Sequence, residues 1–236
     1  NSSVRTRDAA YETVVSRRLP LTLTDSATEN DPCYLMYTSG TTGIPKGALA
    51  LHRNVIHSAM NYYRLCGTTS GDTTLIAIPL FHVTGLIGQF VHMLMIGGTS
   101  VLLREYSTDA YIRASLAHDV TFMFNVPTIY NMLLTREESA RFTKLRLALY
   151  GGAPMTAETI SRLRSRFPCL MLRNAYGATE TSSPATIMPA DWPADKIASV
   201  GKPVPGADIR IMDEHGNRCE PGEVGGDRGR AGGVDG

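Results

Sequence analysis

Residues 145–175 read LRLALYGGAPMTAETISRLRSRFPCLMLRNA and indicate the fold class of this 236-residue chain. The apolar runs 145–150 and 170–175 each predict a buried strand. Between them, residues 156–167 have the spacing of an amphipathic helix, and Thr156 is a suitable N-cap. A strand, a helix and a second strand in this order are typical of a parallel β-sheet packed by helices.

The same alternation continues toward the N-terminus. Further strands are predicted at residues 33–37, 74–78, 99–103 and 120–124, and helices at 53–65, 86–96, 108–117 and 127–134. Repeated units of this kind predict an α/β fold with a mainly parallel sheet. The pattern changes after residue 197, where a strand at 207–212 and turns at 213–217 and 219–223 predict an antiparallel hairpin. We therefore expect a subdomain boundary within 189–199.

The composition is typical of a globular domain. Apolar residues make up 43% of the chain and charged residues 19%, which allows a sizeable core. The formal net charge of +1 gives no support to nucleic-acid or membrane-surface binding by bulk charge. The four cysteines have no CxxC spacing, which favours a reduced, cytoplasmic chain over a metal knuckle or a disulfide framework. No apolar run reaches about 18 residues, so no transmembrane segment is expected.

The string YTSGTTGIPKG, residues 37–47, carries the strongest chemical signal. A predicted strand leads into a loop with four hydroxyl side chains, three glycines and one lysine. Glycines let backbone N–H groups turn toward an anion, and a lysine adds a point charge suited to phosphate. The string is not a Walker A loop, because no Ser or Thr follows Lys46. It predicts a phosphate-binding loop; a mobile surface loop is the alternative.

This string resembles the phosphate loop of the adenylate-forming superfamily, which includes acyl-CoA synthetases, luciferases and the adenylation domains of peptide synthetases. Further strings resemble that family's motifs in the family's order: PLFH at 79–82, GGAP at 151–154, NAYGATET at 174–181 and SVGKP at 199–203. The resemblance spans residues 31–224, most of the chain. It implies an incomplete large domain of this family, in which the βα units are followed by the start of a small β-barrel.

The resemblance also implies a set of nucleotide-binding residues. Asn174 would read the adenine amino group and Tyr176 would stack on the ring, while Thr179 would bond the α-phosphate. Glu180 would hold Mg²⁺, with Thr38 as a second candidate ligand. The remaining residues implied to contact ATP or AMP are Thr38, Ser39, Gly40, Thr41, Thr42, Gly43, Lys46, Gly151, Gly152, Ala153 and Gly177.

The acid to be activated would lie in a pocket formed by Phe81, His82, Gly85 and Asn125. Catalytic roles fall to Thr38, Lys46, His82, Thr179 and Glu180. Taken alone, an acidic residue such as Glu180 is typical of a solvated surface, and a lone His82 is typical of a structural histidine. The strings that surround them favour a role in the site.

The function implied is ATP-dependent activation of a carboxylic acid to an acyl-adenylate, followed by thioester formation with coenzyme A. The string before Thr179-Glu180 lacks the tryptophan of acetate-type ligases, which favours a medium- or long-chain fatty acid or an aromatic acid. ATP, Mg²⁺ and coenzyme A are the expected cofactors and co-substrates, and no nucleic acid is expected as a partner. The alternatives are an amino-acid adenylation domain and a non-catalytic nucleotide-binding remnant.

The chain also departs from the family pattern. No Thr-Gly-Asp string follows residue 224, and the family's hinge, C-terminal domain and first part of the large domain are not found. We therefore expect at best a weak nucleotide binder that self-associates through uncovered surfaces. The expected organisation is a polar segment (1–30), a first βα part (31–70), a second βα subdomain (71–190), the start of a barrel (197–224) and a disordered Gly-rich tail (225–236).

Overall fold

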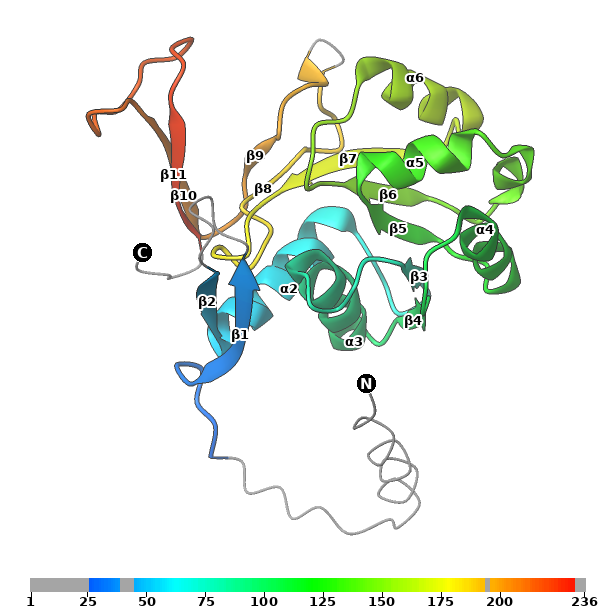
Figure 1. Cartoon of the computed structure of the whole chain (residues 1–236), viewed down its shortest axis with the longest axis horizontal. Helices are drawn as coiled ribbons and strands as arrows, with labels where there is room; N and C mark the ends of the chain where they lie inside the picture. The colour runs from blue at the N-terminus through cyan, green and yellow to red at the C-terminus, as the bar shows by residue number, and fades with distance from the viewer. Residues whose placement is uncertain (1–25, 39–44, 194–195, 232–236) are drawn as a thin grey trace.

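The computed structural model describes residues 26–38, 45–193 and 196–231, with side chains up to residue 226. A seven-stranded sheet in the order β4-β3-β5-β6-β7-β8-β9 forms its centre, and the first five strands are parallel (Figure 1). These strands are β3 (Thr73–Ile76), β4 (Thr99–Leu102), β5 (Phe122–Asn125), β6 (Leu147–Tyr150), β7 (Met171–Tyr176), β8 (Thr186–Ile187) and β9 (Lys202–Pro203). The predicted α/β class with a mainly parallel sheet is confirmed.

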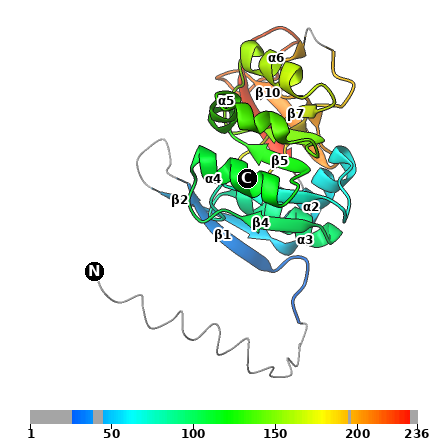
Figure 2. The same cartoon turned by 90° about the vertical axis from the view of Figure 1, so that its right-hand side faces the viewer.

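Helices cover both faces of this sheet (Figures 1 and 2). One face carries α2 (His52–Cys66), a π-helix (Thr84–Val91) and α3 (His92–Ile96); the other carries α4 (Thr108–Ala117), α5 (Pro127–Leu134), a 3₁₀ helix (Glu137–Arg141) and α6 (Ala157–Arg166). Side chains of β5 alternate between the two layers: Phe122 and Phe124 pack with Tyr62 of α2, whereas Met123 packs with Tyr130 of α5. The central strands are apolar at successive positions because both faces are buried.

Local signals in the sequence set the ends of the helices. The Thr156 hydroxyl accepts a hydrogen bond from the Thr159 amide at 3.2 Å, which confirms the predicted N-cap of α6. Ser107 caps α4 in the same way, and Pro127 stands in the first turn of α5. Gly67 ends α2 in the left-handed conformation, with φ of 61°.

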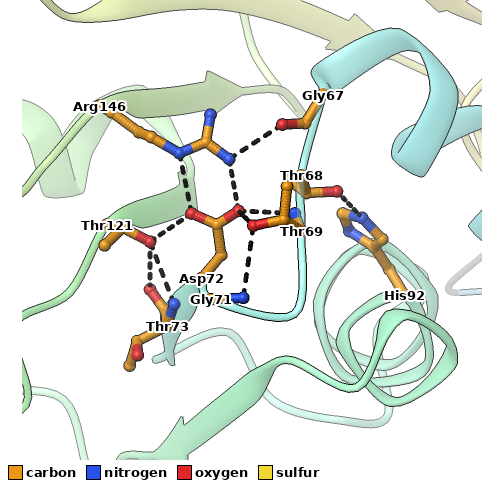
Figure 3. Close-up of polar contacts among 9 residues, drawn as sticks. All are labelled: Gly67, Thr68, Thr69, Gly71, Asp72, Thr73, His92, Thr121 and Arg146. Atoms are coloured by element: carbon orange, nitrogen blue, oxygen red, sulfur yellow. Dashed lines mark hydrogen bonds and ion pairs between the residues drawn. The ribbon is translucent and has the colours of Figure 1, made fainter.

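A polar cluster joins the amino ends of three parallel strands (Figure 3). Asp72, Thr121 and Arg146 stand immediately before β3, β5 and β6. Thr121 Oγ1 donates to Asp72 Oδ1 at 2.7 Å, Arg146 Nε donates to the same oxygen at 2.8 Å, and a second Arg146 nitrogen donates to Asp72 Oδ2. Burial would raise the pKa of Asp72, but the hydrogen bonds from Arg146, Thr121 and the Thr69 amide outweigh burial and hold that pKa below its ordinary value.

Two antiparallel hairpins lie beside the main sheet (Figure 1). Strands β1 (Pro32–Thr38) and β2 (Lys46–Leu51) form the first, and β10 (Ala207–Met212) and β11 (Gly226–Ala231) form the second. The Asp213 amide donates to the Asn217 carbonyl at 2.9 Å, which closes the predicted turn after β10. The predicted antiparallel hairpin is therefore present, whereas the barrel that it would begin stays a prediction.

Two expectations are wrong where the structure describes the chain. Residues 225–236 were expected to be a disordered tail, yet Gly226–Ala231 forms β11. Backbone pairing with β10 needs no side chains, so the glycine content does not prevent it. The main sheet also continues through β9, past the boundary expected within 189–199. The expectations for residues 1–25, 39–44 and 232–236 lie outside the described residues.

Two elements differ from the sequence pattern. Strand β2 was not predicted, because its sequence KGALAL has no β-branched residue; its pairing with β1 fixes it instead. The helix expected at 86–96 starts at Thr84, and its first part is the π-helix. A Cβ at Gly85 would lie 2.6 Å from the Ile78 carbonyl oxygen, so the backbone of this helix lies closer to its neighbour than any other residue allows.

Candidate functional site

The motifs singled out in the sequence gather at the carboxyl ends of the parallel strands. Asn125, Tyr150 and Asn174 pair in register across β5, β6 and β7, which places them in one row along this edge of the sheet. All three side chains are buried. Ligands of open α/β sheets bind at this edge, because the loops that follow the strands are free to surround them.

A cavity of about 330 Å³ opens at this edge. Its walls come from the segment after β6, from the end of β7 and from the connection that precedes β9. The lining residues are Tyr150, Gly152, Ala153, Pro154, Met155, Asn174, Tyr176, Gly177, Ile197, Ala198 and Val200. The cavity thus combines residues of the GGAP and NAYG strings, which nineteen residues separate in the sequence.

The cavity is neutral. Among the described residues that line it, none has a charged side chain at neutral pH, and burial raises the pKa of Tyr150 so that its hydroxyl stays protonated. The Asn174 amide group donates to the Ser199 carbonyl at 3.4 Å, and Tyr176 is 37% exposed at the rim. An amide and an aromatic ring in an otherwise apolar wall suit a flat, neutral, heteroaromatic ligand.

Glycines allow the backbone to form part of this wall. A Cβ at Gly151 would lie 2.4 Å from the Ala175 carbonyl oxygen, so β6 and β7 approach closely where the strands end. Gly152 has φ of 75°, a conformation that favours glycine, and it turns the chain into the cavity wall. These two positions therefore require glycine for the geometry of the site.

The turn after Gly177 carries Thr179 and Glu180. The Ser182 amide donates to the Thr179 carbonyl at 3.1 Å, and the Thr181 hydroxyl donates to the Ala178 carbonyl at 3.0 Å. Glu180 is exposed on this turn and Thr179 is half-buried. Because Gly177 both lines the cavity and begins the turn, a ligand in the cavity can extend toward these two side chains.

The phosphate-loop string spans the first hairpin. Thr38 ends β1 and Lys46 begins β2, and the two residues stand opposite each other in the register. The Thr38 hydroxyl donates to the Lys46 carbonyl at 3.4 Å, and the Lys46 side chain is exposed. The other residues implied in this loop, Ser39, Gly40, Thr41, Thr42 and Gly43, lie outside the described residues.

The residues expected to form an acid pocket lie elsewhere along the same edge. Phe81 is 73% exposed, and its ring centroid lies 4.8 Å from that of His82. Gly85 is buried in the π-helix. The Asn125 amide donates to the Tyr111 hydroxyl at 2.7 Å, and its Oδ1 has no hydrogen-bond partner among the described residues. None of these four residues lines the cavity, and the acid pocket stays a prediction.

Several lining residues were missed in the sequence. Pro154 is the last residue of the GGAP string and Met155 follows it, so this string could have indicated both. Ile197, Ala198 and Val200 come from a connection whose position depends on the antiparallel return from β8 to β9. Val200 belongs to the SVGKP string, which is the one sequence signal for this wall.

Among the described residues of the site, the turn that carries Thr179 and Glu180 is where a metal ion could be held. They contain no group of three or more His, Cys, Asp or Glu side chains that could hold a metal. The turn offers the Glu180 carboxylate and the Thr179 hydroxyl, both oxygen ligands. Mg²⁺ commonly has only one or two protein ligands, because phosphate oxygens and water molecules complete its coordination. These two residues therefore fit a magnesium ion that binds together with a nucleotide.

Comparisons with known proteins identify the family of this chain. Residues 2–226 match the family model described as AMP-binding enzyme. A feruloyl-CoA synthase of Amycolatopsis sp is 36% identical over 198 residues, which are 83% of this chain and 40% of the relative. The 2-succinylbenzoate–CoA ligase of Bacillus subtilis is 36% identical over 81% of this chain and 38% of its own length. The chain thus spans about two fifths of the length of the curated relatives that it matches.

Solved structures give the same result. The o-succinylbenzoate coenzyme A synthetase of Bacillus subtilis, in complex with ATP and magnesium, has a TM-score of 0.77 and 31% identity, covering 88% of this chain and 43% of that one. ATP-bound MatB of Rhodopseudomonas palustris has a TM-score of 0.78 and 28% identity, covering 88% and 41%. In the part of the chain that the structure describes, we find no helix with the length and apolar character of a membrane span. This chain belongs to the family of AMP-binding enzymes.

Proposed function

We propose that this chain binds ATP together with Mg²⁺, with the adenine in the neutral cavity and the phosphates directed toward the turn at Thr179 and Glu180. In the whole protein, this site would activate a carboxylic acid to an acyl-adenylate that then reacts with coenzyme A. The observation that carries the proposal is the cavity itself. It joins the backbone of Gly152, the Asn174 amide and the Tyr176 ring around a space without charge, next to a turn that offers oxygen ligands.

Each residue has a role that follows from its position. Asn174 can both donate to and accept from the edge of an adenine, and Tyr176 can cover the face of the ring. The Thr179 hydroxyl can donate to a phosphate oxygen at the exit of the cavity. Lys46, exposed at the start of β2, can neutralise phosphate charge, and the proposal places it on the β- and γ-phosphates.

Glu180 would hold the magnesium ion, whose positive charge would offset the negative charge that repels an incoming carboxylate. Attack of the carboxylate on the α-phosphate forms the bond of the mixed anhydride and breaks the bond to pyrophosphate. The residues of this chain contribute positioning and oriented donors, which are the main protein contributions to phosphoryl-transfer chemistry.

For the acid, we propose an aromatic carboxylic acid. Two of the relatives described above are named for aromatic acids, feruloyl and 2-succinylbenzoate, and each is 36% identical to this chain. A relative named for sulfoacetate, from Cupriavidus necator, is 32% identical and represents the competing class of small acids. A medium- or long-chain fatty acid has no such relative among the proteins named here.

The acid class can be tested by calorimetry of the 236-residue chain. Ferulate, benzoate, sulfoacetate and octanoate would each be titrated in the presence of saturating Mg·ATP, with buffer and Mg·ATP alone as blanks. The proposal expects saturable binding of the aromatic acids and weaker binding of the other two. Equal binding of octanoate and ferulate would contradict the aromatic class. If the chain binds Mg·ATP but none of the four acids, the result would favour a non-catalytic nucleotide-binding remnant.

A further inference from the structure

Two tyrosines from different elements reach the turn that carries Thr179 and Glu180. The Tyr62 hydroxyl, from α2, shares a hydrogen bond of 3.0 Å with Ser183 Oγ. The Tyr34 hydroxyl, from β1, donates to Ser182 Oγ at 3.3 Å. Both serines are buried, so these contacts lie beneath the turn and not on its solvent side.

Tyr62 is a fixed point for this contact. Its side chain has no exposed surface. The centroid of its ring lies 5.7 Å from the ring centroid of His92 and 5.8 Å from that of Phe124. A Cβ at Gly88 would lie 3.2 Å from the Tyr62 oxygen, so the π-helix backbone also limits where the hydroxyl can move. The hydroxyl therefore has one position from which it meets Ser183.

The turn needs such support. Ser182 and Ser183 have φ of 54° and 33°, a conformation that costs a non-glycine residue free energy and persists only where its surroundings hold it. Ser183 also packs under the nucleotide-site backbone, because a Cβ at Gly177 would lie 2.9 Å from Ser183 Oγ and 3.1 Å from Ser183 Cα. A shift of Ser183 would thus reach the backbone at Gly177, where the turn begins.

We infer that Tyr62 and Tyr34 are positioning residues, which hold Ser183 and Ser182 so that the turn presents Thr179 and Glu180 to the magnesium–nucleotide complex. The inference rests on the proposed function for the identity of that ligand. Tyr34 lies on the strand that ends at Thr38, so its contact also joins the first hairpin to the turn. Neither tyrosine contacts the ligand; both act through the serines.

Hydrogen exchange tests the positioning without any ligand. In Tyr62→Phe, we expect the Thr181 and Ser182 amides, which close the turn, to exchange about tenfold faster than in the unsubstituted chain. Ser183→Ala removes the same hydrogen bond from the other side and should give the same acceleration. The double variant should exchange no faster than either single variant. Tyr130→Phe is the matched control, since its hydroxyl is buried and donates to the Leu149 carbonyl at 2.7 Å, away from the turn.

Nucleotide binding tests the consequence. For Tyr62→Phe and Ser183→Ala, we expect the Kd of Mg·ATP to rise about three- to tenfold, while the Kd of adenosine stays within twofold, because adenosine lacks the phosphates and the metal. A general loss of structure would weaken both ligands equally, and that result would overturn the inference. Unchanged exchange at Thr181 and Ser182 would also overturn it. If the unsubstituted chain binds no Mg·ATP, the proposed function fails, and the exchange rates still decide whether Tyr62 holds the turn through Ser183.

Discussion

Asp72 and Arg146 form an ion pair that joins β3 to β6 at the edge of the sheet opposite the cavity (Figure 3). Arg146 Nε lies 2.8 Å from Asp72 Oδ1, and Thr121, just before β5, donates to the same oxygen. The strands of the sheet are thus fixed at their amino ends by side chains and open to a ligand at their carboxyl ends. In the proposed function the two edges have separate roles, stability at the amino ends and nucleotide binding at the carboxyl ends.

Removal of the acidic partner should destabilise the fold. Asp72 is 3% exposed, and Asp72→Ala removes the carboxylate that accepts from Arg146 and Thr121. The two donors then keep only the carbonyls of Gly67 and Thr73 as acceptors. Because Arg146 keeps 37% of its side chain in solvent, we expect a loss of about 2–3 kcal/mol in the free energy of unfolding, measured by urea titration. The exposed pair of Arg210 and Asp208 is the control: Asp208→Ala should change that free energy by less than about 1 kcal/mol. Equal effects of the two substitutions would contradict this account.

His92 should make stability depend on pH. Burial lowers the pKa of His92 to about 4, and its ring nitrogens bond the Gly88 carbonyl and the Thr68 hydroxyl. As the pH falls from about 6.5 to about 4, the unfolded state takes up a proton that the folded state excludes, so stability is lost in that window. We expect a loss of about 3 kcal/mol, measured as the free energy of unfolding against pH. His92→Gln should flatten this limb, whereas His215→Gln, at an exposed position, should leave it in place.

The glycine pair offers a test of the cavity wall. In Gly151→Ala, the new Cβ would meet the Ala175 carbonyl oxygen at 2.4 Å, so β6 and β7 would have to separate. We expect a loss of about 1–3 kcal/mol in the free energy of unfolding and a large loss of Mg·ATP affinity. In Gly152→Ala the nearest atom lies at 3.5 Å, and only the positive φ is unfavourable, so the loss should be smaller, about 1 kcal/mol. The reverse order of the two effects would contradict the wall described here.

Tyr176 tests the position of the base. If its ring covers the adenine, Tyr176→Ala should raise the Kd of adenosine about fivefold or more, since stacking on an aromatic side chain contributes about 1–3 kcal/mol. Tyr63 is a matched control, because it is similarly exposed, at 45% against 37%, and lies on α2 away from the cavity. Adenosine affinity should be unchanged in Tyr63→Ala. A loss of affinity only in Tyr63→Ala would place the base elsewhere.

Much of the fold could be predicted from the sequence, because local patterns determine it. Strands β5, β6 and β7 and helices α4, α5 and α6 appear close to their predicted bounds. Because β6 and β7 are parallel, their carboxyl ends lie at one edge of the sheet. The proximity of the glycine pair to Asn174 could therefore also be predicted from the sequence. These features depend on short stretches and on the general rule for parallel sheets.

The rest depends on contacts between distant segments. Asp72 and Arg146 are 74 positions apart, and neither stands in a motif that predicts the ion pair. Ile197 and Ala198 reach the cavity because β8 turns back along β7 and β9 turns back along β8, which no local pattern shows. The hydrogen bond of Tyr62 to Ser183 spans 121 positions and likewise has no local signal.

In the proposed function, the turn after the cavity and the first hairpin together bind the phosphates of Mg·ATP. The most direct measurement is a calorimetric titration of the 236-residue chain with Mg·ATP, repeated for Glu180→Ala and Lys46→Ala. Glu214→Ala and Lys144→Ala, at exposed positions outside the site, serve as controls. We predict saturable binding that each site substitution weakens about tenfold and that neither control changes. A chain that is folded by circular dichroism but gives no saturable binding, or equal affinity in all five proteins, would contradict the account.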